Sequence, residues 1–117
     1  MVVTNSVDVD RFITIISERE ASDALIYHRQ RAKHDGPVGL VPDHDMSAGV
    51  KDGWGYISYV DPDHELSTLA GDPQSPEYHG ENCYHPAGSG VRIESFRSAI
   101  VEFLDTARRP RHVNWLQ

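Results

Sequence analysis

Residues 54–60 constrain the fold more than any other segment, because they read Trp-Gly-Tyr-Ile-Ser-Tyr-Val. Aromatic and β-branched side chains favour the pleated backbone of a sheet. Asp-Gly before the segment and Asp-Pro after it are typical of tight turns. These residues are therefore predicted to form a strand at the centre of a sheet. Alternation of side chains places Trp54, Tyr56 and Ser58 on one face and Gly55, Ile57 and Tyr59 on the other.

An amphipathic helix is predicted on each side of the strand-rich region. Residues 7–19 and residues 95–107 both carry apolar side chains three and four positions apart, which is the spacing of one helix face. The second helix should end where Arg108 and Arg109 meet the negative end of the helix dipole and Pro110 stops the helix. The two apolar stripes consist of Val9, Phe12, Ile13 and Ile16, and of Phe96, Ala99, Ile100, Phe103 and Leu104.

Further strands are predicted from alternating or short apolar patterns, whereas residues 42–53 are rich in turn formers and are predicted to be a polar loop. The order of helix, strands, helix and strand indicates an α+β fold, in which an antiparallel meander has the N-terminal and the C-terminal helix packed on one face. We expect residues 1–117 to form one domain. The additional strands are predicted over residues 21–33, 38–41, 65–70, 77–84 and 111–116.

Negative charge is concentrated in the middle of the chain. The 117 residues carry a formal net charge of −7, whereas residues 35–94 alone carry −9, because eleven acids there oppose only Lys51 and Arg92. This balance disfavours binding to nucleic acid or to an anionic membrane. Two interpretations stay open: the acids face water in a loop-rich region, or they form an electronegative face that meets a basic partner.

Cysteine usage and hydropathy bear on the compartment. Cys83 is the single cysteine, which excludes an internal disulfide and a four-thiolate zinc site made by this chain alone. The longest strongly apolar stretch, residues 12–16, is far shorter than the roughly 20 residues of a membrane span, and no secretory signal pattern precedes it. We therefore expect a reduced, cytoplasmic protein without membrane contact.

A cluster of histidine, glutamate and cysteine between residues 79 and 85 is the strongest candidate for catalytic chemistry. The motif His-x-Glu occurs in zinc deaminases, but their downstream Pro-Cys-x-x-Cys ligands have no counterpart here. His79, Cys83 and His85 share parity, so on one strand they would lie on the same face. A small metal-dependent hydrolase or deaminase-like enzyme that uses these residues and Glu81 is therefore an alternative function. We expect no functional metal site, and a buried structural role for Cys83.

Other motifs for catalysis or cofactor binding do not occur in the sequence. No Gly-x-Ser-x-Gly motif or cysteine signature marks a nucleophile. No glycine-rich loop has the lysine and spacing of a phosphate-binding loop. The pairs Asp43/Asp45 and Asp61/Asp63 could bind a divalent cation, but tight turns select the same residues. We expect no catalytic residue and no cofactor.

The end of the chain is distinctive, and several of its motifs are similar to one known family. These are Glu102-Phe103-Leu104, Arg109-Pro110, and Val113 with Trp115; the central strand and the opening helix are similar as well. The chain resembles the first-numbered immunity-protein family of bacterial polymorphic toxin systems. Two positions depart from the family pattern: Ala107 replaces a helix-ending Gly, and Arg92 stands where a Pro is common.

The resemblance implies an α+β protein that binds and neutralises a cognate toxin domain, frequently a nucleic-acid deaminase, and it implies no catalytic residue. A toxin that acts on nucleic acid needs a basic groove, which an acidic surface can occlude. We expect a 1:1 complex without direct contact to nucleic acid, made by the acidic segment rather than by the basic C-terminal residues.

A generic protein-interaction module would share this composition and is a further alternative. The residues expected to contact the toxin are acidic or aromatic: Asp43, Asp45, Asp52, Trp54, Tyr56, Asp61, Asp63, Glu65, Glu77, Tyr78 and Glu81. Because Asp61, Asp63 and Glu65 lie at a predicted turn, lysine at these positions should weaken the contact without unfolding the protein.

Overall fold

The computed structural model describes residues 6–18, 23–37 and 39–116. None of the helices in these ranges is long and apolar enough to cross a membrane. The elements follow one another as α1 (Ser6–Glu18), β1 (Ala24–Ile26), β2 (Lys33–Gly36), β3 (Gly39–Pro42), β4 (Asp45–Lys51), β5 (Trp54–Asp61), β6 (His64–Leu69), β7 (Tyr78–His79), β8 (Tyr84–His85), β9 (Val91–Arg92), α2 (Ile93–Thr106) and β10 (Trp115–Leu116).

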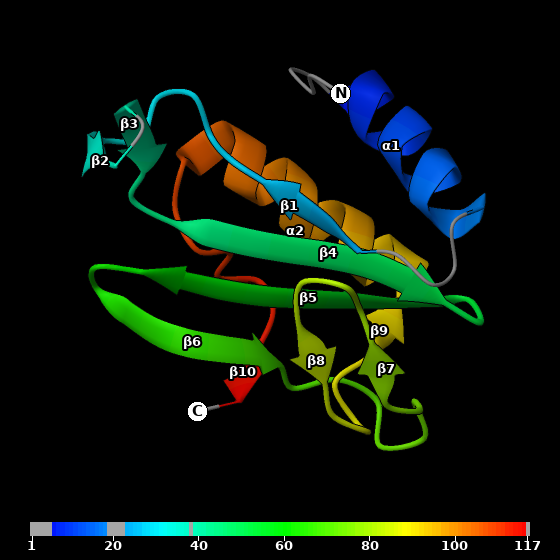
Figure 1. Ribbon diagram of the computed structural model, residues 1–117. Helices are drawn as coiled ribbons and strands as arrows, with labels where there is room; N and C mark the ends of the chain where they lie inside the picture. The colour runs from blue at the N-terminus through cyan, green and yellow to red at the C-terminus, as the bar shows by residue number, and fades with distance from the viewer. Residues whose placement is uncertain (1–5, 19–22, 38, 117) are drawn as a thin grey trace.

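The main sheet has the strand order β1-β4-β5-β6-β10, and every neighbouring pair is antiparallel. β4, β5 and β6 form a meander, and β9 pairs with the first two residues of β5. Both helices cover one face of this sheet (Figure 1). The predicted α+β architecture and the central position of residues 54–60 are therefore confirmed.

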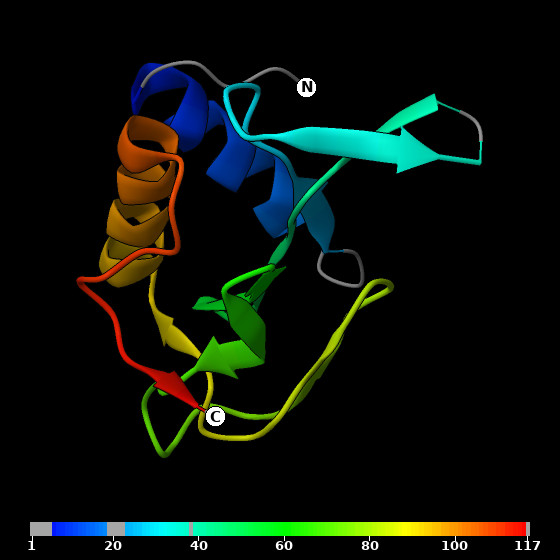
Figure 2. The ribbon, with the colours of Figure 1, turned by 90° about the vertical axis from the view of Figure 1, so that its left-hand side faces the viewer.

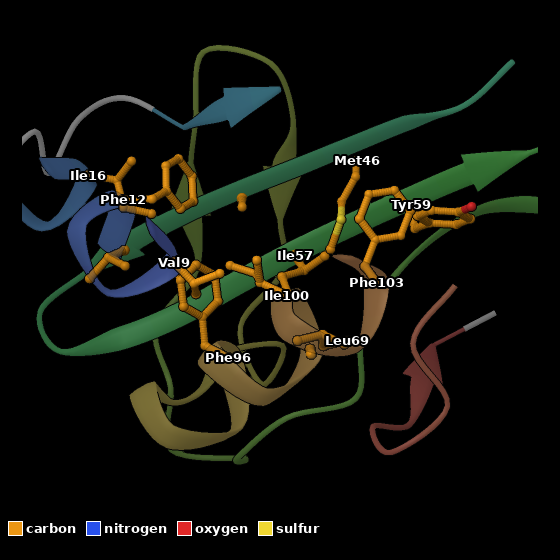
Figure 3. Packing of buried hydrophobic residues seen from close by; sticks show 13 residues of the cluster. Val9, Phe12, Ile16, Met46, Ile57, Tyr59, Leu69, Phe96, Ile100 and Phe103 are labelled. Atoms are coloured by element: carbon orange, nitrogen blue, oxygen red, sulfur yellow. The ribbon is translucent and has the colours of Figure 1, made fainter. Parts of the chain in front are cut away.

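The core lies between the helices and the sheet, and side chains from both layers interdigitate there (Figure 3). Phe96, Ile100 and Phe103 of the predicted stripe are buried, whereas Leu104 is only half-buried. The buried cluster consists of Val9, Phe12, Ile16, Met46, Ala48, Val50, Ile57, Tyr59, Leu69, Phe96, Ala99, Ile100 and Phe103.

The two faces of β5 are as predicted from alternation. Ile57 and Tyr59 belong to the core, and a Cβ at Gly55 would lie 2.4 Å from the Phe96 ring. Gly55 therefore lets α2 approach the sheet closely. On the opposite face, the Tyr56 ring packs 5.1 Å from the ring of Tyr78, between centroids.

The predicted polar loop over residues 42–53 is wrong, because most of it forms β4. Met46 to Val50 are all buried, and residues 45–51 pair along their whole length with β5. The small and turn-forming side chains of this segment have low strand propensity. The Asp52-Gly53 turn, with φ of 52° and 81°, folds the segment back onto β5 as a two-residue hairpin, and that pairing decides its conformation.

Other predicted boundaries also change. Of the strand predicted over residues 21–33, only Ala24–Ile26 joins the main sheet. Four residues of the predicted elements lie outside the described ranges: residue 19 of the first helix, residues 21 and 22 of this strand, and residue 38 of the next strand. Residues 77–84 form a hairpin of two short strands rather than one strand. The last strand shrinks to Trp115–Leu116, and α2 begins at Ile93, two residues before the prediction.

Two hairpins stand outside the main sheet. The β2–β3 hairpin projects away from the body, and the β7–β8 hairpin lies against the sheet face opposite the helices (Figure 2). Tyr78 and His85 connect this second hairpin to the sheet, because both rings contact Tyr56. We call the sheet face opposite the helices, together with β7–β8, the hairpin face.

Candidate functional site

Two histidines near the start of the chain use both ring nitrogens in hydrogen bonds. The backbone N–H of Gln30 donates to His28 Nδ1 at 3.1 Å, so the proton on Nε2 is donated to the carbonyl of Leu104 at 2.8 Å. The backbone N–H of His28 donates to His44 Nε2 at 2.9 Å, so His44 Nδ1 carries the proton that faces Asp43 at 3.0 Å. Burial lowers the pKa of His44 more than Asp43 raises it. Neither ring has a nitrogen left for catalysis.

Arg31 ties the end of α2 to the sheet. Its guanidinium makes two bonds to Asp43, at 2.9 and 3.0 Å, and lies 3.5 Å from Asp61. A third bond of 2.9 Å reaches the carbonyl of Ala107, one of the last helix carbonyls, which have no partner inside the helix. The role of this arginine is therefore structural.

Asp61 occupies the centre of the same polar region, and its side chain is only 3 % exposed. It accepts hydrogen bonds from the Tyr59 hydroxyl and from His64, both at 2.8 Å, and from the backbone N–H of Asp63 at 2.9 Å. Burial raises the pKa of Asp61, but these hydrogen bonds outweigh it and hold the pKa below its ordinary value. Asp61 is therefore not the exposed turn residue that the sequence suggested, and lysine there would place a second cation beside Arg31. We now expect the triple lysine variant to be destabilised. Asp63 and Glu65 are exposed.

A second buried polar cluster lies beneath the β7–β8 hairpin. Asp23 accepts hydrogen bonds from the Ser47 hydroxyl at 2.8 Å and from the backbone N–H of Asn82 at 2.9 Å. His85 Nε2 is 3.9 Å from Asp23, and neither nitrogen of this buried ring has a hydrogen-bond partner among the described residues. Burial lowers the pKa of His85 to about 4, against the opposing effect of Asp23. Tyr78 stacks on this ring with the planes 11° apart.

The histidine and cysteine cluster of the metal hypothesis is not brought together. Residues 80–83 form the turn of the hairpin, so His79 pairs with Tyr84, and His85 pairs with Tyr78. His85 is thus buried while His79 is exposed. The inference that His79, Cys83 and His85 lie on one face of a single strand is therefore wrong. Cys83 is half-buried in the turn rather than buried. Within the described ranges no three His, Cys, Asp or Glu side chains are close enough to hold a metal ion.

The hairpin face carries a group of large exposed side chains that sequence reasoning missed. Strand register places Leu25 opposite Ser47, and Leu116 opposite Thr68, on this face. Five hydrophobic or aromatic side chains on or beside it are between 42 % and 61 % exposed, and exposed apolar groups gathered on one face mark interaction sites. They are Leu25, Tyr27, Leu66, Tyr84 and Leu116.

Two of these side chains are tyrosines held by exposed carboxylates. The hydroxyl of Tyr27 donates to Asp45 at 2.9 Å, and the hydroxyl of Tyr84 donates to Glu77 at 2.8 Å. Each tyrosine thus sits beside a negative charge, one at the start of β4 and one on the β7–β8 hairpin. Alternation could have indicated Leu25 and Tyr27, but no sequence signal pairs Tyr84 with a residue seven positions before it.

The residues expected to contact a partner differ in their exposure and in whether they are already paired within the fold. Tyr56 and Tyr78 are buried between the sheet and the β7–β8 hairpin, and they present no surface in this fold. Asp43 and Asp61 are engaged with Arg31, and Trp54 is half-buried. The other six are exposed acids. Asp45, Asp63 and Glu65 lie at one end of β4 and β5, while Asp52 and Glu77 lie at the other, near Lys51. Glu81 lies in the turn of the β7–β8 hairpin.

The α+β scaffold therefore presents exposed acids and tyrosines on one side, a surface of the kind that binds another protein. The chain matches the family model described as Immunity protein Imm1 over residues 1–117, and it belongs to this family of immunity proteins. The family gives the chain a role in toxin immunity, with a cognate toxin as its partner. No curated protein and no solved structure matches the chain.

Proposed function

We propose that this immunity protein inhibits its toxin by covering the toxin's basic substrate groove with the hairpin face and the acids around it. The toxin would be an enzyme that modifies nucleic acid, of the deaminase class that the family resemblance implies. The observation that carries the proposal is the combination of exposed acids at both ends of β4 and β5 with exposed tyrosines and leucines between them.

Charge supports this choice of surface. A groove that binds nucleic acid is lined by cations that contact phosphates. Carboxylates at both ends of an apolar patch can meet such cations, while the patch itself excludes water from the contact. The chain's net charge of −7 would also accelerate the encounter with a basic partner, because opposite charges steer diffusing molecules.

Tyr27 and Tyr84 are proposed as anchors of the contact. Tyrosine is enriched among residues that dominate binding energy, because it buries a large ring and keeps a polar tip. Both hydroxyls are already fixed by carboxylates, so the rings lose little conformational freedom when the partner binds.

Inhibition by binding, without catalysis by this chain, is favoured over the metal-enzyme alternative. The ligand set His79, Cys83 and His85 is divided between the two sides of the hairpin. The polar network around Arg31 uses its charged groups to hold α2 and the β5–β6 turn. A single 1:1 complex is proposed because one hairpin face is present in each chain.

The test is the association rate with the cognate toxin domain. Asp45→Lys with Glu77→Lys should lower the association rate about tenfold or more, and the wild-type rate should fall as salt rises. Glu94→Lys with Asp105→Lys is the matched control, since it makes the same charge change at exposed positions of α2. Equal effects of the two variants, or a rate indifferent to salt, would refute the electrostatic mechanism. If no toxin domain binds, the proposed function is refuted, and the generic protein-interaction module is the alternative that is retained.

A further inference from the structure

A groove of about 640 Å³ lies beside the C-terminal segment, and among the described residues Asp63 on its rim is the one acid that it shares with the proposed contact. Arg108, Arg109 and Arg111 line it together with the apolar side chains of Val113 and Trp115. The groove is large enough for several side chains of a ligand, since small-molecule sites commonly span about 300–1,000 Å³.

The three arginines are not neutralised within the described part of the chain, where no carboxylate makes an ion pair with their guanidinium groups. Arg31 on the same groove differs, because Asp43 and Asp61 pair with it. The unmatched positive charge is therefore local to residues 108–111, in a protein whose overall charge is negative.

Hydrogen bonds and a cation–π contact fix the segment that carries these arginines. The Glu102 carboxylate accepts the backbone N–H groups of Arg111 and His112, at 2.6 and 3.1 Å. The Trp115 indole N–H donates to the carbonyl of Pro110 at 2.9 Å. Arg109 lies over the Trp115 ring at 5.3 Å, a cation–π contact that orders the guanidinium. The arrangement is preorganised, so little ordering is needed when an anion binds.

We propose that this groove binds a short, carboxylate-bearing segment of the cognate toxin, as a second contact besides the hairpin face. The identity of the partner rests on the proposed function. Guanidinium groups bind carboxylates through two parallel hydrogen bonds, and Trp115 and Val113 give the aliphatic part of acidic side chains an apolar wall. A long polyanion such as nucleic acid fits less well, because the remaining surface repels it.

The residues on the opposite rim of the groove restrict which side chains a bound segment can place there. Asp63 lies on that side and is exposed, while Asp61 is satisfied by Arg31, Tyr59 and His64. A segment bound here would turn its carboxylates toward residues 108–111 and a neutral or basic side chain toward Asp63. This inference revises the expectation that the C-terminal residues stay out of the contact.

The groove can be tested without the toxin by NMR titration of the full chain with a hexaglutamate peptide. Backbone amides of residues 108, 109 and 111–115 should shift, and Arg108→Ala with Arg111→Ala should weaken binding about tenfold. Arg11→Ala with Arg92→Ala removes two exposed arginines elsewhere and should leave the affinity within about twofold. Equal loss in both variants, or shifts outside the groove, would overturn the site. Tighter binding of a ten-nucleotide single strand than of the peptide would overturn the ligand class.

Toxin binding separates this inference from the proposed function. Arg108→Ala with Arg111→Ala should raise the dissociation rate about tenfold and change the association rate little, since buried contacts act mainly on dissociation. An unchanged dissociation rate, with a slower association of the Asp45/Glu77 variant, would refute the groove and retain the proposed function. If the Asp45/Glu77 variant associates at the wild-type rate and the groove variant loses binding, the groove is retained and the electrostatic mechanism of the proposed function is refuted.

Discussion

The buried His85 ring should make the stability of the protein depend on pH between about 6.5 and 4. Burial lowers the pKa of His85 in the fold to about 4, whereas the unfolded chain restores the ordinary value of 6.5. In this range the unfolded chain binds a proton that the folded ring does not. The free energy of unfolding therefore falls as the pH falls from 6.5 to 4, and the His85 contribution levels off below 4.

The magnitude follows from the difference of these two pKa values. Each pH unit in the range costs about 1.4 kcal/mol. Relative to pH 7, His85 therefore lowers the free energy of unfolding by about 2 kcal/mol at pH 5 and by about 3 kcal/mol below pH 4. The carboxylates whose pKa is lowered, such as Asp43 and Asp61, lose their contribution only as the pH falls below their ordinary value of 3.8. The two effects therefore occupy different pH ranges.

Urea unfolding followed by tryptophan fluorescence at pH 7, 6 and 5 measures this effect. His85→Phe keeps an aromatic ring beside Tyr78 and removes the titration, so its stability should fall by about 2 kcal/mol less than that of the wild type between pH 7 and pH 5. His44, which is also buried, contributes equally to both proteins and cancels in the difference. His79→Phe, at the exposed position of the same hairpin, should retain the wild-type slope. Parallel pH profiles for wild type and His85→Phe would refute the reasoning.

Three further predictions concern single residues. Phe103→Ala should lower the free energy of unfolding by about 3–5 kcal/mol in urea denaturation, because the buried ring leaves a cavity among Tyr59, His44 and His28; an unchanged midpoint would show that α2 does not pack there. Ala107→Gly should raise stability by about 1 kcal/mol in the same assay, since Ala107 ends α2 with a φ of 57°, and the control Ala99→Gly inside the helix should lower it by at least about 1 kcal/mol. Asp61→Asn should cost about 3 kcal/mol by thermal unfolding, because it leaves Arg31 and His64 poorly paired, whereas Asp63→Asn should stay within about 0.5 kcal/mol; equal costs would mean that the network does not stabilise the fold.

The helices and the central strand were predictable because their signals are local. The spacing of Val9, Phe12 and Ile16 defines one face of a helix, and Pro110 after two arginines marks the end of another. Alternation along residues 54–60 also predicts which side chains face the helices, as Gly55 against Phe96 confirms. The family resemblance rests on the same local motifs and is confirmed over residues 1–117.

Tertiary contacts decided the rest, since they join residues that are distant in the sequence. β4 is a strand because β5 and β1 pair with both of its edges, although residues 45–51 have weak strand propensity. The turn at residues 80–83 separates His79 from His85, and so the parity that favoured a metal site does not apply.

The charge count located negative charge in the sequence but not on the surface. Packing buries Tyr56 and Tyr78, engages Asp43 and Asp61 with Arg31, and leaves Tyr27 and Tyr84 exposed beside carboxylates. Which aromatic or acidic side chains a partner can reach thus depends on layers that assemble across the whole chain, because burial is a property of the packed structure and not of residue type.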